Sequence, residues 1–207
     1  MTRILAISGS LRSRSSNTSL LEAAALLAPE GVEITIYRGL GNLPHFNPDL
    51  EGLESDAPLQ YRRQLQDADG VLISSPEYAH GVPGVMKNAL DWVVGSGELV
   101  NKPVALLNAS LRSTHAHASL LETLTVMSAR VIPQACITLP HWDKTLDAAG
   151  IVSHVQISRL LRESIDELVR AIQCEQQSRA RALSRDQQDS ESTRALDSSL
   201  RHYSSPT

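Results

Sequence analysis

The sequence has few cysteines and no long apolar run, and both absences narrow the class of protein. Only two of its 207 residues, Cys136 and Cys174, are cysteines, and no short spacing joins them. A disulfide framework or a zinc ribbon needs more, so we expect two reduced thiols, as in cytoplasmic proteins. The apolar run Ile4–Ile7 is too short for a signal peptide, and no later segment is apolar enough to span a bilayer. We therefore expect a cytoplasmic protein with no membrane partner.

The chain also lacks a large excess of charge of either sign. The formal net charge of -4 gives no electrostatic reason to expect nucleic acid as a partner. Hydrophobic residues make up 42% and charged residues 20% of the chain, which is ordinary for a globular protein. The length corresponds to about one domain. These values predict one domain with an apolar core.

Short apolar runs recur along the chain, and each is followed by a loop and a helical pattern. We predict strands over residues 4–8, 32–37, 71–73, 103–107 and 131–139, and helices over 20–28, 59–68, 85–94, 116–129 and 153–174. This alternation predicts an α/β protein with a parallel sheet and helices on both faces. Five strands favour the flavodoxin-like doubly wound order, which binds ligands beyond the carboxyl ends of the strands. We expect the loops after Ser8, Ser75 and Leu107 to form the site.

The character of the chain changes near residue 174. From Glu175 onward Gln, Ser, Arg and Asp dominate, and apolar residues are sparse. Such a segment lacks the apolar surface that offsets the entropy of ordering. We predict a flavodoxin-like domain over residues 1–174 and a polar, partly disordered tail over 175–207.

The first loop, Ser8–Thr18, has the composition of a phosphate site. It follows a buried strand and precedes a helix, whose free N–H groups and dipole favour an anion. Gly9 permits a sharp turn, serine and asparagine side chains donate hydrogen bonds, and Arg12 and Arg14 add positive charge. Neither the Gly-x-Gly-x-x-Gly fingerprint nor the P-loop lysine is present, which favours a monophosphate. The alternative is that Asn17 or Thr18 only caps the helix.

The second loop begins at Pro76 and leads into a helix through two prolines and two glycines. These residues make an irregular, rigid backbone. Such a backbone at the end of a buried strand suits a flat heterocyclic ligand.

Each of the two loops contains a recognisable motif. The motif G-S-L-R-x-x-S-x-N is present from Gly9 to Asn17. The motif P-E-Y-N-x-x-x-P-G-x-x-K-N-A-x-D-W is present from Pro76 to Trp92, with Ala79 in place of Asn. With these two motifs the chain resembles the NAD(P)H-dependent FMN reductase family of the flavodoxin-like fold, which includes quinone, azo and chromate reductases. The resemblance covers residues 1–174 and leaves the tail outside it.

The resemblance implies FMN as cofactor and NADPH or NADH as co-substrate. It implies that the FMN phosphate is held by Ser10, Arg12, Ser15, Ser16 and Asn17. The isoalloxazine and ribityl chain would be lined by Pro76, Glu77, Tyr78, Ala79 and, next to it, His80. The third loop, with Asn108, Ala109 and Ser110, would meet the other side of the flavin.

Several of these residues also have structural interpretations. Ala79 loses the side-chain hydrogen bond that Asn would make, for which His80 is a candidate to compensate. Tyr78 either stacks near the flavin or fills a dimer interface. Met86 and Trp92 are expected in the core or a subunit interface. We expect Lys87 and Asp91 on the helix surface or in packing. The structural interpretation of Glu77 is that it binds the backbone of its loop.

We expect no metal site and no catalytic side chain. His115 and His117 lie two apart, a spacing that does not put them on one helix face, and neither cysteines nor carboxylates accompany them. The alternative is that one of the two faces the flavin edge or the nicotinamide. The predicted reaction is hydride transfer from the nicotinamide to FMN, and then to free flavin, a quinone or an azo compound. The cofactor supplies this chemistry, and the protein supplies position and access.

Two other functions fit the fold. A flavodoxin-type electron carrier clamps its flavin between aromatic rings and is strongly acidic, whereas this chain has 3% aromatics and a net charge of only -4. A flavin-free interaction protein would retain the fold alone. For the enzyme we expect a homodimer or homotetramer, with interface segments at 85–94 and 95–101. The loops 39–58 and 140–150 would shape the acceptor pocket.

Overall fold

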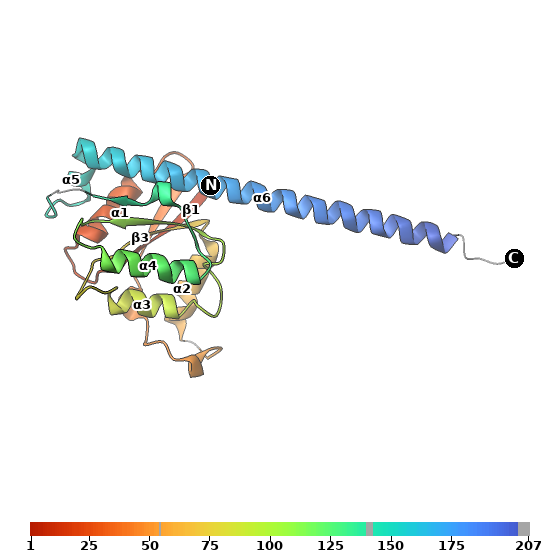
Figure 1. The fold of residues 1–207 in the computed structure, drawn as a ribbon, viewed down its shortest axis with the longest axis horizontal. Helices are drawn as coiled ribbons and strands as arrows, with labels where there is room; N and C mark the ends of the chain where they lie inside the picture. The colour runs from red at the N-terminus through yellow and green to blue at the C-terminus, as the bar shows by residue number, and fades with distance from the viewer. Residues whose placement is uncertain (54, 140–142, 203–207) are drawn as a thin grey trace. The chain divides into compact units, whose positions relative to one another are not determined.

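The computed structural model describes residues 1–53, 55–139 and 143–202 (Figure 1). The chain divides into two units, Met1–Ala171 and Ile172–Thr207. The first unit contains the whole sheet and the loops that the sequence assigns to the site. The boundary predicted at residue 174 and the order of the tail stay predictions.

The first unit is built on a parallel sheet. Its strands are β1 (Thr2–Ser8), β2 (Val32–Tyr37), β3 (Gly70–Ser74), β4 (Pro103–Asn108), β5 (Arg130–Val131) and β6 (Ile137–Thr138). The strand order is β2-β1-β3-β4-β5, and β6 pairs with β4. This is the flavodoxin-like order that the sequence predicts.

The last predicted strand, over residues 131–139, is two short strands. Both pair with β4, β5 next to Pro103 and Val104 and β6 next to Leu107 and Asn108. Between them a 3-10 turn covers Pro133–Ala135. Pro133 has no N–H to donate to β4, and its fixed φ suits the first position of a helical turn. The range 131–139 thus holds strand residues as predicted, but as two short strands where the sequence predicts one.

Helices cover both faces of the sheet (Figure 1). They are α1 (Ser16–Leu26), α2 (Asp56–Asp67), α3 (Gly84–Asp91), α4 (His115–Val126), α5 (Ala148–Ser153) and α6 (Val155–His202). α1 and α5 pack against each other, and α2, α3 and α4 lie on the other face of the sheet (Figure 1). The predicted 39–58 loop contains two single 3-10 turns, Leu40–Asn42 and Pro48–Leu50.

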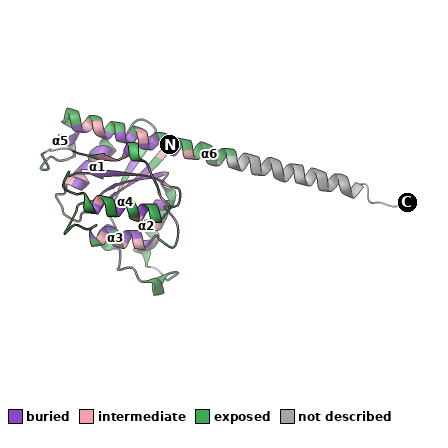
Figure 2. Cartoon of the chain, viewed as in Figure 1, coloured by how far each residue is buried: buried purple, intermediate pink, exposed green. Residues whose placement is uncertain are grey.

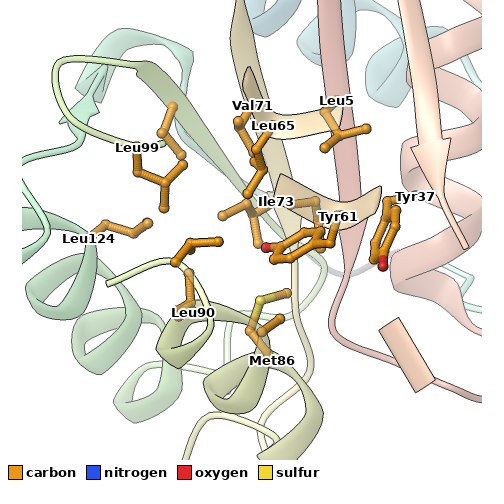
Figure 3. Packing of buried hydrophobic residues seen from close by; sticks show 14 of the residues in the cluster. Leu5, Tyr37, Tyr61, Leu65, Val71, Ile73, Met86, Leu90, Leu99 and Leu124 are labelled. Carbon is orange, nitrogen blue, oxygen red and sulfur yellow. The ribbon is translucent and has the colours of Figure 1, made fainter. Parts of the chain in front are cut away.

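The core on the α2–α4 face follows the alternation of a strand. Leu5 and Ile7 of β1 and Val71 and Ile73 of β3 point to this face, where they meet Tyr61 (Figure 3). Buried positions line the sheet and the inner faces of its helices (Figure 2). Met86 and Trp92 are 0% and 4% exposed, so both are core residues.

α6 extends beyond the predicted end at Cys174 and continues to His202. The segment 175–202 contains neither glycine nor proline, so no residue in it forces the helix to end. Among the described residues, no helix is long and apolar enough to cross a membrane.

Candidate functional site

The carboxyl ends of β1, β3 and β4 open onto one cavity of ≈ 460 Å³. Its walls come from the three loops after these strands and from one residue before α5. The lining residues are Ser10, Arg12, Ser15, Ser16, Asn17, Pro76, Glu77, Tyr78, Ala109, Ser110, Arg112, Ser113 and Lys144. The structure thus brings together the three loops that the sequence places at the site. Residues 140–142, part of the predicted acceptor loop, lie outside the described residues.

The first loop presents buried polar groups to this cavity. Ser10, Ser15 and Asn17 are 9%, 6% and 7% exposed. Ser15 caps α1 by accepting the N–H of Thr18, so the alternative that Asn17 or Thr18 is the cap was wrong. In the described part of the chain, the N–H groups of Ser16 and Asn17 have no acceptor. Orphan donors at a helix start are suited to an anion.

The Asn17 carboxamide is positioned by β3. The hydroxyl of Ser74, which is 0% exposed, lies 3.0 Å from Asn17 Oδ1 and 2.8 Å from the carbonyl oxygen of Leu107. When the hydroxyl proton is donated to Oδ1, the Asn17 amide group is left free to donate elsewhere. This contact ties the first loop to the two central strands.

Gly9 is where the first and second loops approach most closely. A Cβ at this position would lie 2.2 Å from Ser75 Oγ, 2.9 Å from Ser75 Cβ and 3.2 Å from Ser75 Cα. The N–H of Gly9 donates to the carbonyl of Ser74 at 2.9 Å. Gly9 is therefore required by space, because its φ is not positive.

The second loop turns tightly at Ala79 and His80. Tyr78 and Gly81 form an antiparallel bridge with both backbone hydrogen bonds, and Ala79 and His80 have φ of 49° and 60°. Positive φ at both central residues is what a type I′ turn requires, and Asn is favoured there. Ala79 and His80 do not line the cavity, so their contact with a cofactor stays a prediction.

Replacing Ala79 by Asn is expected to stabilise the protein by about 1 kcal/mol, because Asn tolerates the left-handed region that Cβ sterics penalise in Ala. Thermal unfolding of the two proteins measures the difference. A matched Ala79→Val variant should shift the midpoint downward, since a β-branched residue is poorly suited to positive φ. A lower midpoint for the Asn variant would contradict the role of the turn.

Glu77 joins the second loop to the start of α4. Its Oε2 accepts the N–H of Ala116 at 2.8 Å, so Glu77 binds backbone of α4 and not the loop backbone that the structural interpretation named. The rings of His80 and His115 also meet, with centroids 4.2 Å apart. Burial lowers the pKa of His117, so this imidazole is neutral at pH 7.

The third loop is braced by its own polar groups. Asn108 Oδ1 accepts the N–H of Ser110, and Asn108 Nδ2 donates to the carbonyl of Ser113. Ser110 Oγ accepts the N–H of Arg112 at 3.3 Å. These bonds explain why Ser110, Arg112 and Ser113 line one wall of the cavity.

Nine of the eleven predicted site residues line the cavity, and sequence reasoning missed Arg112, Ser113 and Lys144. Arg112 and Ser113 lie two and three residues after Ser110 on a loop already assigned to the site. Lys144 lies outside both motifs, in a segment whose path the sequence does not reveal. Its positive charge was the one available signal.

The end of the second motif has a structural role. Asn88 accepts the N–H of Phe46 at 2.8 Å and donates to the carbonyl of Pro44 at 2.9 Å. Trp92 Nε1 donates to the same carbonyl at 2.7 Å, and Lys87 pairs with Asp91 on the helix surface. Asn88 and Trp92 thus hold the segment before the Pro48–Leu50 turn against α3.

The donor set of the cavity fits a phosphate monoester. Two buried serines, a buried asparagine, free helix N–H groups and Arg12 lie on one loop, and phosphate accepts from such donors. Close approach at Gly9 leaves no room for a side chain between this loop and the second. Among the described residues, no group of three His, Cys, Asp or Glu could hold a metal ion.

Comparison with known proteins gives consistent matches. A family model described as NADPH-dependent FMN reductase matches residues 2–144. The chain is 30% identical over 172 residues to an NAD(P)H-dependent FMN reductase of Pseudomonas aeruginosa, covering 80% of this chain and 92% of that protein. It is 29% identical over 171 residues to a 2-hydroxy-1,4-benzoquinone reductase of a Burkholderia species, covering 80% and 93%.

Among solved structures, the chain is similar to a flavoenzyme NAD(P)H:(acceptor) oxidoreductase from Paracoccus denitrificans. The TM-score is 0.71 at 27% sequence identity, covering 84% of this chain and 98% of that chain.

Proposed function

The chain belongs to the NADPH-dependent FMN reductase family, and we propose that its cavity binds FMN for electron transfer from NADPH or NADH to a quinone or a free flavin. One observation carries this function. The buried donors of the first loop, the start of α1 and Arg12 line the same cavity as the second and third loops. A phosphate end and a heterocycle end thus share one space.

Bound FMN supplies the hydride chemistry, and the chain supplies binding, orientation and access. Ser10, Ser15 and Asn17 donate hydrogen bonds to the phosphate, and Arg12 adds charge. Glu77 holds the second loop against α4 through Ala116, which keeps the walls of the cavity at a constant spacing. Fixed walls orient a flat ring for transfer to a substrate stacked on it.

An enzyme needs one open face of the flavin, and the cavity supports this requirement. Among the described lining residues, Tyr78 is the only aromatic side chain, and it is 53% exposed. A carrier that clamps its flavin between two rings would need a second aromatic wall. The observation therefore favours the enzyme over the electron carrier.

The test is the absorbance spectrum of the purified protein with FMN, before and after anaerobic addition of NADPH and then of NADH. We expect the flavin bands to bleach with at least one donor, and to return when a benzoquinone is added. Bound flavin that keeps its spectrum with both donors would transfer the assignment to an electron carrier. Protein that binds no FMN would refute the proposal.

We also propose that the enzyme is a homodimer or a homotetramer that works in the cytoplasm, where its nicotinamide donors are available. Val94 and Val100 follow α3 and lie in the predicted interface segments 85–94 and 95–101. They are 53% and 47% exposed, and apolar surface of this kind is suited to a symmetric interface. Light scattering should give a mass of two or four subunits. A mass of one subunit at micromolar concentration would contradict the oligomer.

A further inference from the structure

The cavity carries more positive charge than the family motif supplies. Arg12 belongs to the first motif, whereas Arg112 and Lys144, which also line the cavity, belong to neither motif. In the described part of the chain, none of these three side chains pairs with a carboxylate. Glu77 is the one acidic lining residue, and its Oε2 accepts a backbone N–H. These three exposed cations are therefore free to attract an anionic ligand to the cavity.

Lys144 lies between two carboxylates that make local hydrogen bonds. Asp143 Oδ1 accepts the N–H and the hydroxyl of Thr145 at 2.9 and 2.6 Å, and these bonds lower the pKa of Asp143. Asp147 caps α5 by accepting the N–H of Gly150 at 2.8 Å. Both neighbouring carboxylates thus make bonds within the segment, and Lys144 remains directed to the cavity that it lines.

The segment is also placed by its packing. It leads directly into α5, and α5 packs against α1 (Figure 1), the helix whose first residues line the phosphate end of the cavity. Lys144 reaches the same cavity as Ser15, Ser16 and Asn17. An ammonium group that lines this cavity is available to an anion bound there.

We propose that Lys144 binds the 5′-phosphate of the flavin, as a cation additional to Arg12. The inference rests on the proposed function, because it requires FMN in this cavity. A phosphate monoester carries a charge of roughly -1.5 to -2 at neutral pH, which one guanidinium does not neutralise. Lysine acts as a compact point charge and would contact only the phosphate. Riboflavin lacks this phosphate, so the interaction should affect the affinity for FMN and leave the affinity for riboflavin unchanged.

The test compares the affinities of FMN and riboflavin for the wild type and Lys144→Gln, by titration of flavin fluorescence. The loss of one charge-assisted hydrogen bond should weaken FMN by about tenfold and leave riboflavin within about twofold. The salt dependence of FMN affinity should also decrease in the variant, because one screened charge is gone. Lys144→Arg should restore most of the affinity.

The matched control is Arg63→Gln, which removes the same charge from an exposed residue of α2 that does not line the cavity. It should leave both affinities unchanged. Equal loss of FMN and riboflavin in Lys144→Gln would overturn the proposal, since it would indicate a structural role. Unchanged FMN affinity with weaker NADPH binding would also overturn it. Wild-type protein that binds neither flavin would instead refute the proposed function itself.

Discussion

Replacing Gly9 by alanine is expected to weaken FMN binding by about 100-fold, through overpacking between two loops. The added methyl group would lie 2.2 Å from Ser75 Oγ and 2.9 Å from Ser75 Cβ. Rotation of the Ser75 hydroxyl relieves the first contact and leaves the second, so the backbone must move. The first and second loops then move apart, so the residues that hold the phosphate and those that line the heterocycle are no longer at the spacing that FMN requires. Flavin fluorescence titration measures the loss.

A double variant separates this steric cause from general damage. Gly9→Ala with Ser75→Gly removes Oγ and Cβ, the two nearest atoms, and leaves Ser75 Cα 3.2 Å from the new methyl group. We expect most of the FMN affinity to return. Gly84→Ala is the matched control, because no atom lies within 4 Å of the Cβ that it adds. A Gly9→Ala protein that binds FMN normally would show that the two loops are not in fixed contact.

The strand order could be predicted from the sequence because every central strand is a short apolar run followed by a helix. Ile4–Ser8 and Val71–Ile73 are buried on both faces, so their pattern is continuous and easily recognised. The last strand could not be predicted correctly. Its 3-10 turn depends on how Pro133 meets the ladder of β4, which is a tertiary relation.

Some residues of the candidate site could likewise be predicted from the sequence, and others could not. Residues from Ser10 to Asn17 and from Pro76 to Tyr78 could be predicted, because each lies on a contiguous motif after a strand. Lys144 could not, since its place depends on α5 packing against α1. The turn at Ala79 and His80 could not be predicted either. The alanine that replaces Asn in the motif gives no sign of the positive φ at these two residues.

Replacing Arg62 by methionine is expected to lower the free energy of unfolding by about 3 kcal/mol, because it leaves a buried carboxylate without its cation. Arg62 Nε lies 2.8 Å from Glu98 Oε1, and the Glu98 side chain is 1% exposed. The remaining partners, Gln66 and Ser96, are neutral donors. The same charge acts on Tyr61, whose pKa is raised by burial and further by Tyr37 and Glu98. Urea denaturation measures the loss in the free energy of unfolding. The dependence of this free energy on urea concentration should have the same slope as in the wild type.

The second step of this cycle decides whether charge or volume is responsible. Arg62→Met combined with Glu98→Gln removes the unpaired charge and keeps the shape of the side chain, so about half of the lost stability should return. Arg159→Met is the control, because its pair with Glu163 is exposed on both sides and such pairs contribute about 0–1 kcal/mol. If the double variant were no more stable than Arg62→Met, the packing of the arginine stem and not the Glu98 charge would account for the effect.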